Sequence, residues 1–215
     1  MLSNEDYLNI FHEIKNSITL INSTLQLVAK AHPEVADYEY WSEAMSEIDF
    51  LKSMVTQFSS ARLCSHLNVM QVNIYSFMYQ FVRSIHALTH DGFFCNISLD
   101  DDLPLIELDP QLIKQAMINL VKNAYEAMNC TGEINIHVTY QEPYMNISIT
   151  DLGGGLDPTI ECNMFQPFIT SKTGGSGVGL SITKQIIEIH HGTLSYESRP
   201  GDGCTFMISL PLTQN

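Results

Sequence analysis

The sequence predicts an α+β chain in which an N-terminal helical hairpin is followed by an α/β sandwich. Before residue 65, apolar residues recur at alternating steps of four and three, which is the spacing of helices that pack along a seam. After that point, helical spacing alternates with short stretches of period two, as in strands that are buried on one face. Helices segregated against one mixed sheet form a layered sandwich.

Two apolar seams indicate the hairpin. The first consists of Tyr7, Phe11, Ile14, Ile18, Ile21, Leu25 and Val28. Pro33 interrupts it, because proline lacks an amide proton and disfavours helix before it. The second seam consists of Trp41, Ala44, Ile48, Leu51, Val55 and Phe58. Two helices cannot cover both seams, so we expect a homodimer that closes a four-helix bundle, and we assign residues 1–65 to this hairpin.

Residues 66–215 form the second expected domain, with its boundary between Cys64 and Val72. Asn73 and Asp109-Pro110 indicate helix starts, because asparagine and aspartate cap helices and proline fits the first helical position. The expected helices cover residues 73–88, 109–128 and 176–191, and the expected strands cover residues 93–99, 133–140, 144–150, 192–198 and 203–210.

Composition narrows the function classes. The chain has 215 residues, 45% hydrophobic content and a net charge of −14 without a basic stripe, so nucleic-acid binding is not expected. We find no apolar run of about 18 residues and an acidic N-terminus, so neither membrane insertion nor a signal peptide is expected. The five cysteines are scattered without a CxxC pair, which favours reduced thiols in the cytoplasm.

Polar residues on the central helix and after a strand are candidates for a ligand site. Asn119 and Asn123 are four apart and therefore share one helix face, and their carboxamide oxygens suit Mg²⁺. For the helix alone, two solvated asparagines are the simpler interpretation. Asp151 ends a strand and is followed by a flexible loop with Gly153 and Gly155. The alternative is that Asp151 only stabilises a turn and binds no ligand.

A glycine loop opens the last expected helix. Gly175, Gly177 and Gly179 lack side chains, so backbone amides can approach phosphates there, and the helix N-terminus favours anions. A loop of this kind is by itself more often only flexible. Here it follows Lys172, whose ammonium group can meet a phosphate.

Four segments occur in a fixed order: Gln115–Met128, Asp151–Gly155, Phe165–Lys172 and Gly175–Leu180. Together they resemble the N, G1, F and G2 boxes of the histidine-kinase branch of the GHKL (Bergerat-fold) ATPases. The resemblance covers nearly the whole chain. It implies a Bergerat-type sandwich that binds ATP and Mg²⁺ under a lid of residues 157–176.

The same resemblance implies roles for single residues. Asp151 accepts a hydrogen bond from the adenine amino group, Asn123 is the Mg²⁺ ligand, and Asn119 faces the same cluster. Thr205, in the closing strand, lies by adenine. The other cofactor-binding residues that it implies are Gly153, Gly155, Lys172, Gly175, Gly177, Gly179 and Leu180. Glu126 would repel a phosphate and receives no role.

His12 follows a seam residue on the flank of the hairpin, where periodicity alone indicates a solvated helix residue. The sequence FHEIKN around it resembles the H box of histidine-kinase phosphotransfer domains. This implies that His12 is the phosphoryl acceptor and Glu13 the proton acceptor, and that Asn16 orients a water in the reverse reaction. A neutral imidazole is a nucleophile near neutral pH. Ser17 replaces the proline that the family usually carries next, so a proline bend is not expected here.

The sequence therefore predicts a cytoplasmic, homodimeric histidine kinase core. ATP phosphorylates His12, and the phosphoryl group passes to an aspartate of a response-regulator receiver domain. One alternative is a dimeric histidine phosphotransferase or scaffold with a non-catalytic nucleotide domain. Another is a GHKL protein serine kinase, a class that lacks the heptad hairpin with HEIKN.

Overall fold

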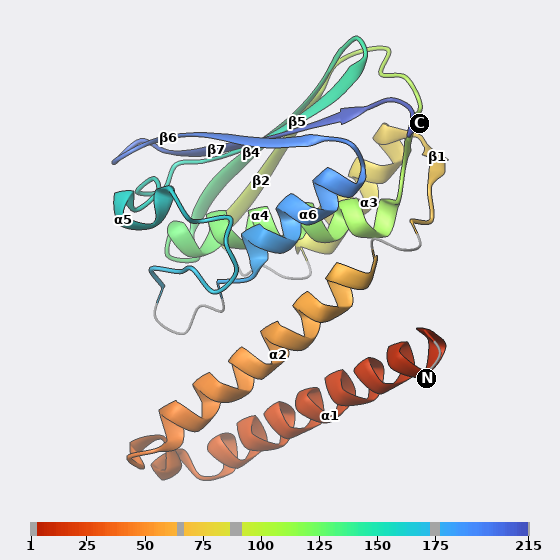
Figure 1. Ribbon diagram of the computed structural model, residues 1–215. Helices are drawn as coiled ribbons and strands as arrows, with labels where there is room; N and C mark the ends of the chain where they lie inside the picture. Colours follow the sequence, from red (N-terminus) through yellow and green to blue (C-terminus); the bar gives the residue numbers. More distant parts are fainter. Residues whose placement is uncertain (1–3, 64–66, 87–91, 173–176, 215) are drawn as a thin grey trace.

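The computed structural model describes residues 4–63, 67–86, 92–172 and 177–214. A long helical hairpin lies beneath a layer of helices, which in turn covers one face of a sheet (Figure 1). This arrangement confirms the α+β class and the α/β sandwich that the sequence predicts. Within the described residues, none of the helices combines the length and the apolar character needed to cross a bilayer.

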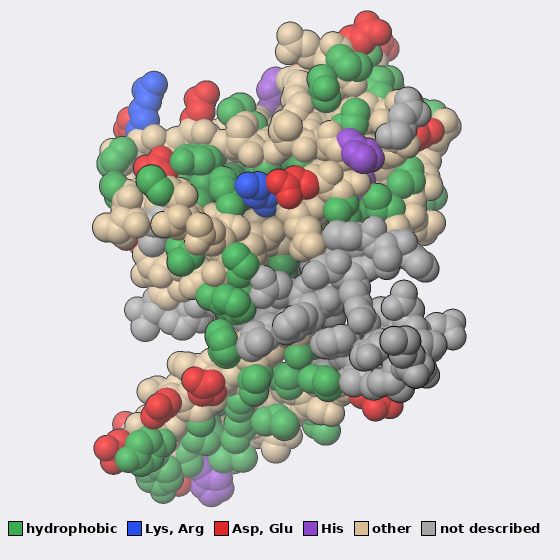
Figure 2. Space-filling view, viewed as in Figure 1, with side chains coloured by type: hydrophobic (Ala, Val, Ile, Leu, Met, Phe, Trp, Pro, Cys, Tyr) green, Lys and Arg blue, Asp and Glu red, His purple; other side chains and the backbone are tan. Residues whose placement is uncertain are grey.

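The hairpin consists of α1 (Asn4–Ala31) and α2 (Trp41–Leu63), joined by the short 3-10 helix η1 (Pro33–Asp37). Pro33 takes the first position of η1, where its missing amide proton costs no hydrogen bond. Ile18 and Val55 are buried between the two helices. Most other described apolar side chains of the hairpin stay exposed, namely Ile14, Leu20, Ile21, Leu27, Val28, Phe50 and Leu51. Figure 2 shows hydrophobic side chains gathered along the lower part of the hairpin.

The main sheet has the strand order β2-β4-β5-β7-β6. Its strands are β2 (Phe93–Leu99), β4 (Gly132–Gln141), β5 (Tyr144–Asp151), β6 (Thr193–Arg199) and β7 (Gly203–Pro211). Only β2 and β4 pair in parallel, and the other neighbours are antiparallel. All five match expected strands to within about a residue. A second sheet pairs β1 (Met70–Val72) with β3 (Ile106–Leu108), and the sequence did not indicate it.

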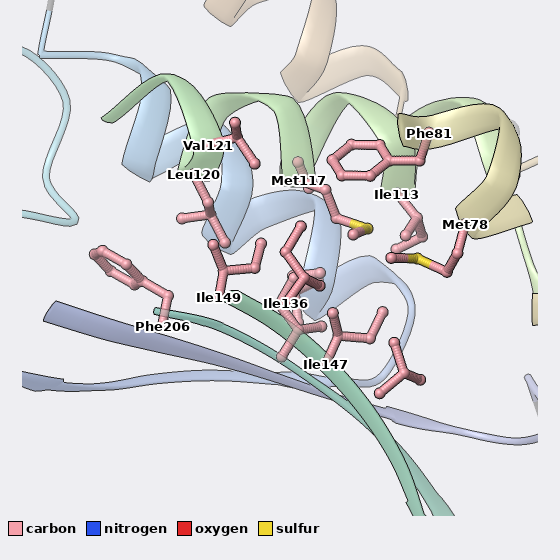
Figure 3. Packing of buried hydrophobic residues seen from close by; sticks show 14 of the residues in the cluster. Met78, Phe81, Ile113, Met117, Leu120, Val121, Ile136, Ile147, Ile149 and Phe206 are labelled. Carbon is pink, nitrogen blue, oxygen red and sulfur yellow. The ribbon is translucent and has the colours of Figure 1, made fainter. Parts of the chain in front are cut away.

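Helices α3 (Ile74–His86), α4 (Pro110–Ala127) and α6 (Gly179–Ile189) cover one face of the main sheet (Figure 1). A single-turn helix, α5 (Pro158–Glu161), lies beyond the end of β5. In Figure 3, Met117 and Leu120 of α4 point toward Ile136, Ile147 and Ile149 of the sheet. Alternation along each strand places these isoleucines on the helix side and polar residues on the other side.

A buried histidine joins the start of α4 to the end of α6. The Asp109 carboxylate caps α4, because its Oδ1 accepts from the backbone N–H groups of Gln111 (3.0 Å) and Leu112 (3.2 Å). The Asp109 N–H donates to His190 Nε2 (3.0 Å), while His190 Nδ1 donates to the Ile186 carbonyl (2.7 Å). Burial lowers the pKa of His190, so the ring is neutral and its two nitrogens serve as one acceptor and one donor. This link holds α4 and α6 in fixed relation.

Candidate functional site

A cavity of about 460 Å³ lies where α4, the end of β5, the start of β7 and the first turn of α6 meet. Its walls come from segments that are far apart in the sequence. The lining residues that carry polar or flexible groups are Asp49, Gln115, Asn119, Lys122, Asn123, Glu126, Asp151, Gly155, Asp157, Thr170, Ser171, Lys172, Gly177 and Gly179. Met164, Leu180, Cys204 and Phe206 add apolar walls. The cavity wall therefore combines polar and apolar groups.

Asn119 and Asn123 of α4 both line this cavity. Asn119 Nδ2 donates to the Gly179 carbonyl (3.2 Å) and lies 3.4 Å from Thr183 Oγ1, which ties α4 to the first turn of α6. Asn123, one helical turn later, is half-buried and lines the same cavity. Val178 is the N-cap of α6 and makes no side-chain capping bond. Its side chain therefore does not occupy the first backbone N–H groups of this helix, which can donate to a ligand.

Asp151 is buried at the end of β5, with 5% of its surface exposed. Its Oδ1 accepts from the backbone N–H groups of Gly153 (2.9 Å) and Cys204 (3.3 Å). Burial raises the pKa of this carboxyl, while the two N–H groups and the charge of Lys172 lower it. A carboxylate that is held by two backbone donors has a fixed orientation and can accept a donor from a ligand in the cavity.

Two glycines keep the loops around the cavity tightly packed. Gly155 has φ +77°, and a Cβ there would lie 2.6 Å from the Arg199 carbonyl oxygen. Gly177 has φ +62°, and a Cβ there would lie 2.6 Å from the carbonyl carbon of Phe168. The Phe168 N–H also donates to the Gly177 carbonyl (2.9 Å). Both positions therefore require glycine for conformation and for space.

Lys172 lines the cavity and pairs with an acid that lines it too. Its Nζ lies 2.7 Å from Glu126 Oε2 and 3.5 Å from the Asn123 carbonyl oxygen. Lys122, four residues before Glu126 on α4, has its Nζ 3.8 Å from Glu126 Oε1. Glu126, which received no role from the sequence, thus stands between two cations.

Aromatic side chains anchor the segment between Asp157 and Lys172. The ring of Phe165 lies 6.0 Å from that of Tyr196, which lies 6.3 Å from that of Phe206 in the cavity wall. On the hairpin side, the ring of Phe168 lies 5.3 Å from that of Phe50 in α2. Asp49, the neighbour of Phe50, lines the cavity as well. The segment is therefore held between the sheet and the hairpin.

The sequence of this chain is similar to those of several histidine kinases. Residues 108–214 match the family described as histidine kinase-, DNA gyrase B- and HSP90-like ATPase. The signal transduction histidine-protein kinase AtoS of Escherichia coli is 30% identical over 205 residues, which are 94% of this chain and 34% of AtoS. The sensory histidine kinase/phosphatase NtrB of Vibrio alginolyticus is 28% identical over 213 residues, 94% of this chain and 60% of NtrB.

A solved structure decides the family. The catalytic domain of histidine kinase ThkA is 30% identical, with a TM-score of 0.57, and the match covers 68% of this chain and 99% of that domain. This chain belongs to the histidine kinase family.

The structure of histidine kinase ThkA in complex with the response regulator protein TrrA extends the likeness to the hairpin. It matches with a TM-score of 0.68 and 25% identity, over 98% of this chain and 62% of that chain. The expected Bergerat-type ATPase domain is thereby confirmed. The kinase chain spans about a third of the length of AtoS and less than two thirds of that of NtrB.

The kinase structure places most of the expected nucleotide residues around one cavity. Those that line it are Asn119, Asn123, Asp151, Gly155, Lys172, Gly177, Gly179 and Leu180. Gly153 does not line it, but its N–H holds the Asp151 carboxylate. Gly175 lies outside the described residues.

Thr205, which is expected to lie by adenine, does not line this cavity. Residues 204 and 205 face opposite sides of β7, and it is Cys204 that lines the cavity. Thr205 faces the other side, where its Oγ1 lies 3.0 Å from Thr150 Oγ1. Strand alternation predicts this difference, because Phe206 and Cys204 share one face while Thr205 takes the other.

The expected H-box residues lie in α1. Glu13 and Asn16 are exposed on α1, and neither lines the cavity. His12 belongs to the same helix, but its side chain lies outside the described part of the structure. The hairpin residue that sequence reasoning missed is Asp49, because a contact between helix and lid leaves no periodic signal.

Proposed function

We propose that this chain is the core of a two-component sensor histidine kinase. ATP bound in the cavity phosphorylates His12, and the phosphoryl group then passes to an aspartate of a receiver domain. The observation that carries the proposal is the convergence of Asn123, Asp151 and Lys172 on one cavity, in a chain that also bears HEIKN on a helical hairpin.

The residues around Asp151 suit adenine. The Asp151 carboxylate, oriented by two backbone N–H groups, accepts a hydrogen bond from the adenine amino group. Cys204 and Phe206 give the apolar wall that a flat base requires. Burial raises the pKa of the Cys204 thiol to about 12, so it acts as a neutral packing group and not as a nucleophile.

The residues around Lys172 and the start of α6 suit the phosphates. The first N–H groups of α6 and the charge of Lys172 favour an anion there. Among the described residues, no group of three or more His, Cys, Asp or Glu side chains is placed to hold a metal ion. An Mg²⁺ ion would take a protein ligand from Asn123, which lines the cavity, and further oxygens from the nucleotide. When bound, Mg²⁺ neutralises part of the phosphate charge.

His12 is the proposed nucleophile. One imidazole nitrogen forms a bond to the γ-phosphorus as the bond from that phosphorus to the ADP oxygen breaks, and the bonding electrons leave with ADP. Glu13 takes the proton that the other ring nitrogen releases. In the second step a receiver carboxylate attacks the phosphorus, and the phosphorus–nitrogen bond breaks. The complex of the relative ThkA with TrrA supports a response regulator as the partner.

We further propose that the protein is a homodimer in the cytoplasm, with residues 1–65 as the dimerisation hairpin and 66–215 as the ATP-binding domain. The exposed stripe of Ile14, Ile21 and Val28 supports a second copy as the missing half of a four-helix bundle. Free thiols at all four described cysteines are consistent with a reducing compartment.

The test is autophosphorylation with γ-labelled ATP and Mg²⁺, followed by locating the label. We expect an acid-labile label that is absent from His12→Gln. An acid-stable label on serine would support the serine-kinase alternative. Nucleotide binding without any label would support a phosphotransferase or scaffold with a non-catalytic nucleotide domain.

A further inference from the structure

The two cations in the cavity wall share one acid. Among the described lining residues, Lys122 and Lys172 are the only lysines, and there is no arginine. Both lie near the Glu126 carboxylate, with Lys172 at 2.7 Å from one oxygen and Lys122 at 3.8 Å from the other. The carboxylate thus occupies the donors that a phosphate group would use.

We propose that Glu126 is a specificity-determining residue that competes with nucleotide phosphates for Lys172. This inference rests on the proposed function of the cavity. A carboxylate carries one negative charge, whereas a terminal phosphate carries more charge and three acceptor oxygens. A polyphosphate therefore displaces Glu126 from Lys172, but each binding event must first break the 2.7 Å ion pair.

The competition acts only on the phosphate part of a ligand. Adenosine reaches Asp151 and the apolar wall without touching Lys172, so Glu126 does not affect its binding. Glu126 lowers the affinity for ATP, so the affinities for ATP and for adenosine differ less than they would without it. The Lys172 and Glu126 side chains are 40% and 36% exposed, so water screens the pair and its effect is modest.

Two other roles for Glu126 lead to different results. If Glu126 only repels phosphates through space, its neutralisation strengthens their binding whether or not Lys172 is present. If the ion pair only holds Lys172 in the correct place, neutralisation weakens phosphate binding. Competition requires a gain that depends on Lys172.

The experiment is calorimetric titration of the whole protein with adenosine, ADP and a non-hydrolysable ATP analogue at fixed Mg²⁺. The variants are Glu126→Gln, Lys172→Met and the double variant. Glu188→Gln is the matched control, because it removes the same charge from another surface pair, with Lys184 at 3.8 Å, away from the cavity.

We expect Glu126→Gln to tighten binding of the ATP analogue about two- to fivefold, the range of an exposed ion pair, and to leave adenosine unchanged. We expect the gain to disappear in the Lys172→Met background and to be absent from Glu188→Gln. Three results would overturn the competition. In the first, the affinity gain from Glu126→Gln persists in the Lys172→Met background. In the second, Glu126→Gln weakens binding of the ATP analogue, and in the third it changes the affinity for adenosine equally.

The same titrations distinguish a failure of the proposed function from a failure of this inference. If wild-type protein binds neither adenosine nor the ATP analogue, the cavity is not a nucleotide site and both proposals fall. If wild type binds both ligands and Asp151→Asn weakens both, the site stands, and the result with Glu126→Gln then decides the inference alone.

Discussion

At Asp151, opposing influences act on one carboxylate. Burial raises its pKa, while the N–H groups of Gly153 and Cys204 and the charge of Lys172 favour the ionised form. The result is an acceptor that is oriented by the backbone and needs no movement to meet a donor. An asparagine would keep the shape but lose the charge.

Asp151→Asn is therefore expected to weaken ATP binding at least tenfold, because a hydrogen bond to a charged acceptor contributes roughly 1.5–3 kcal/mol. Titration with a fluorescent ATP analogue measures this, and the thermal midpoint and the sedimentation coefficient serve as controls for folding and assembly. Unchanged affinity in a folded variant would show that this carboxylate does not face the base.

Asn16 allows a test of the reverse reaction. It lies one helical turn after His12 on α1, is exposed, and carries no charge that must change. We expect its carboxamide to orient a water against an aspartyl phosphate in the reverse reaction. Asn16→Ala should keep autophosphorylation within a few fold and slow the decay of a phosphorylated receiver domain. Equal decay rates would remove Asn16 from the reaction.

At the scale of elements, the contact between α4 and α6 depends on the protonation state of His190. Burial lowers its pKa, so the unfolded chain binds this proton more readily than the folded one. The stabilising contribution is complete above the unfolded pKa of about 6.5 and decreases as pH falls toward the folded pKa.

We therefore expect the free energy of unfolding of the ATP-binding domain to fall between pH 7.5 and pH 5.5, and to fall less in His190→Gln. Urea unfolding at both pH values measures the difference. At pH 7.5 the free energy of unfolding of the variant should already be lower by about 1–3 kcal/mol. The reason is that the buried Asp109 N–H loses its acceptor, His190 Nε2. The same pH dependence in both proteins would mean that other groups cause it.

The contact between α2 and residues 166–172 is a second link between elements. Phe50 and Phe168 pack at 5.3 Å, and the Phe168 N–H donates to the carbonyl of Gly177 beside α6. Phe50→Ala should speed amide hydrogen exchange in residues 166–172 several-fold, while the core strands keep their protection. Tyr40→Ala is the control, because Tyr40 is an exposed aromatic residue at the far end of the hairpin. Equal exchange in both variants would show that the contact does not restrain these residues.

Local signals predict most elements of this fold. The Asp109 cap, the breaks at Pro33 and Gly192, and strand alternation give boundaries within a few residues of those observed. The short strands β1 and β3 escape prediction, because three residues are too few to show a period. Motif order likewise predicts most residues that line the cavity. It does not indicate that Cys204 lines the cavity and Thr205 does not, since a shift of one residue changes the strand face. The sequence does not indicate the ion pair of Lys172 with Glu126, because it depends on packing between segments that are far apart in the chain.

At the scale of the whole molecule, the hairpin leaves more apolar surface in water than one copy can cover. Leu20 and Leu27 are 69% and 67% exposed, and Ile21 is 50% exposed. Such a stripe on a helix is expected to be covered by another helix. Asn22, buried on the same helix with an unpaired Oδ1, adds a polar group that packing between copies would have to satisfy.

Ile21→Glu should convert the dimer into a monomer, because burying an unpaired carboxylate in the bundle costs roughly several kcal/mol. Ser23→Glu, an exposed change two residues away on α1, should leave the dimer intact. Sedimentation at micromolar concentration measures both, and ATP affinity should stay within about twofold in each, since neither Ile21 nor Ser23 lines the cavity. A wild-type monomer would refute the dimer. Dimers of equal stability in Ile21→Glu and Ser23→Glu would show that the copies meet through another surface.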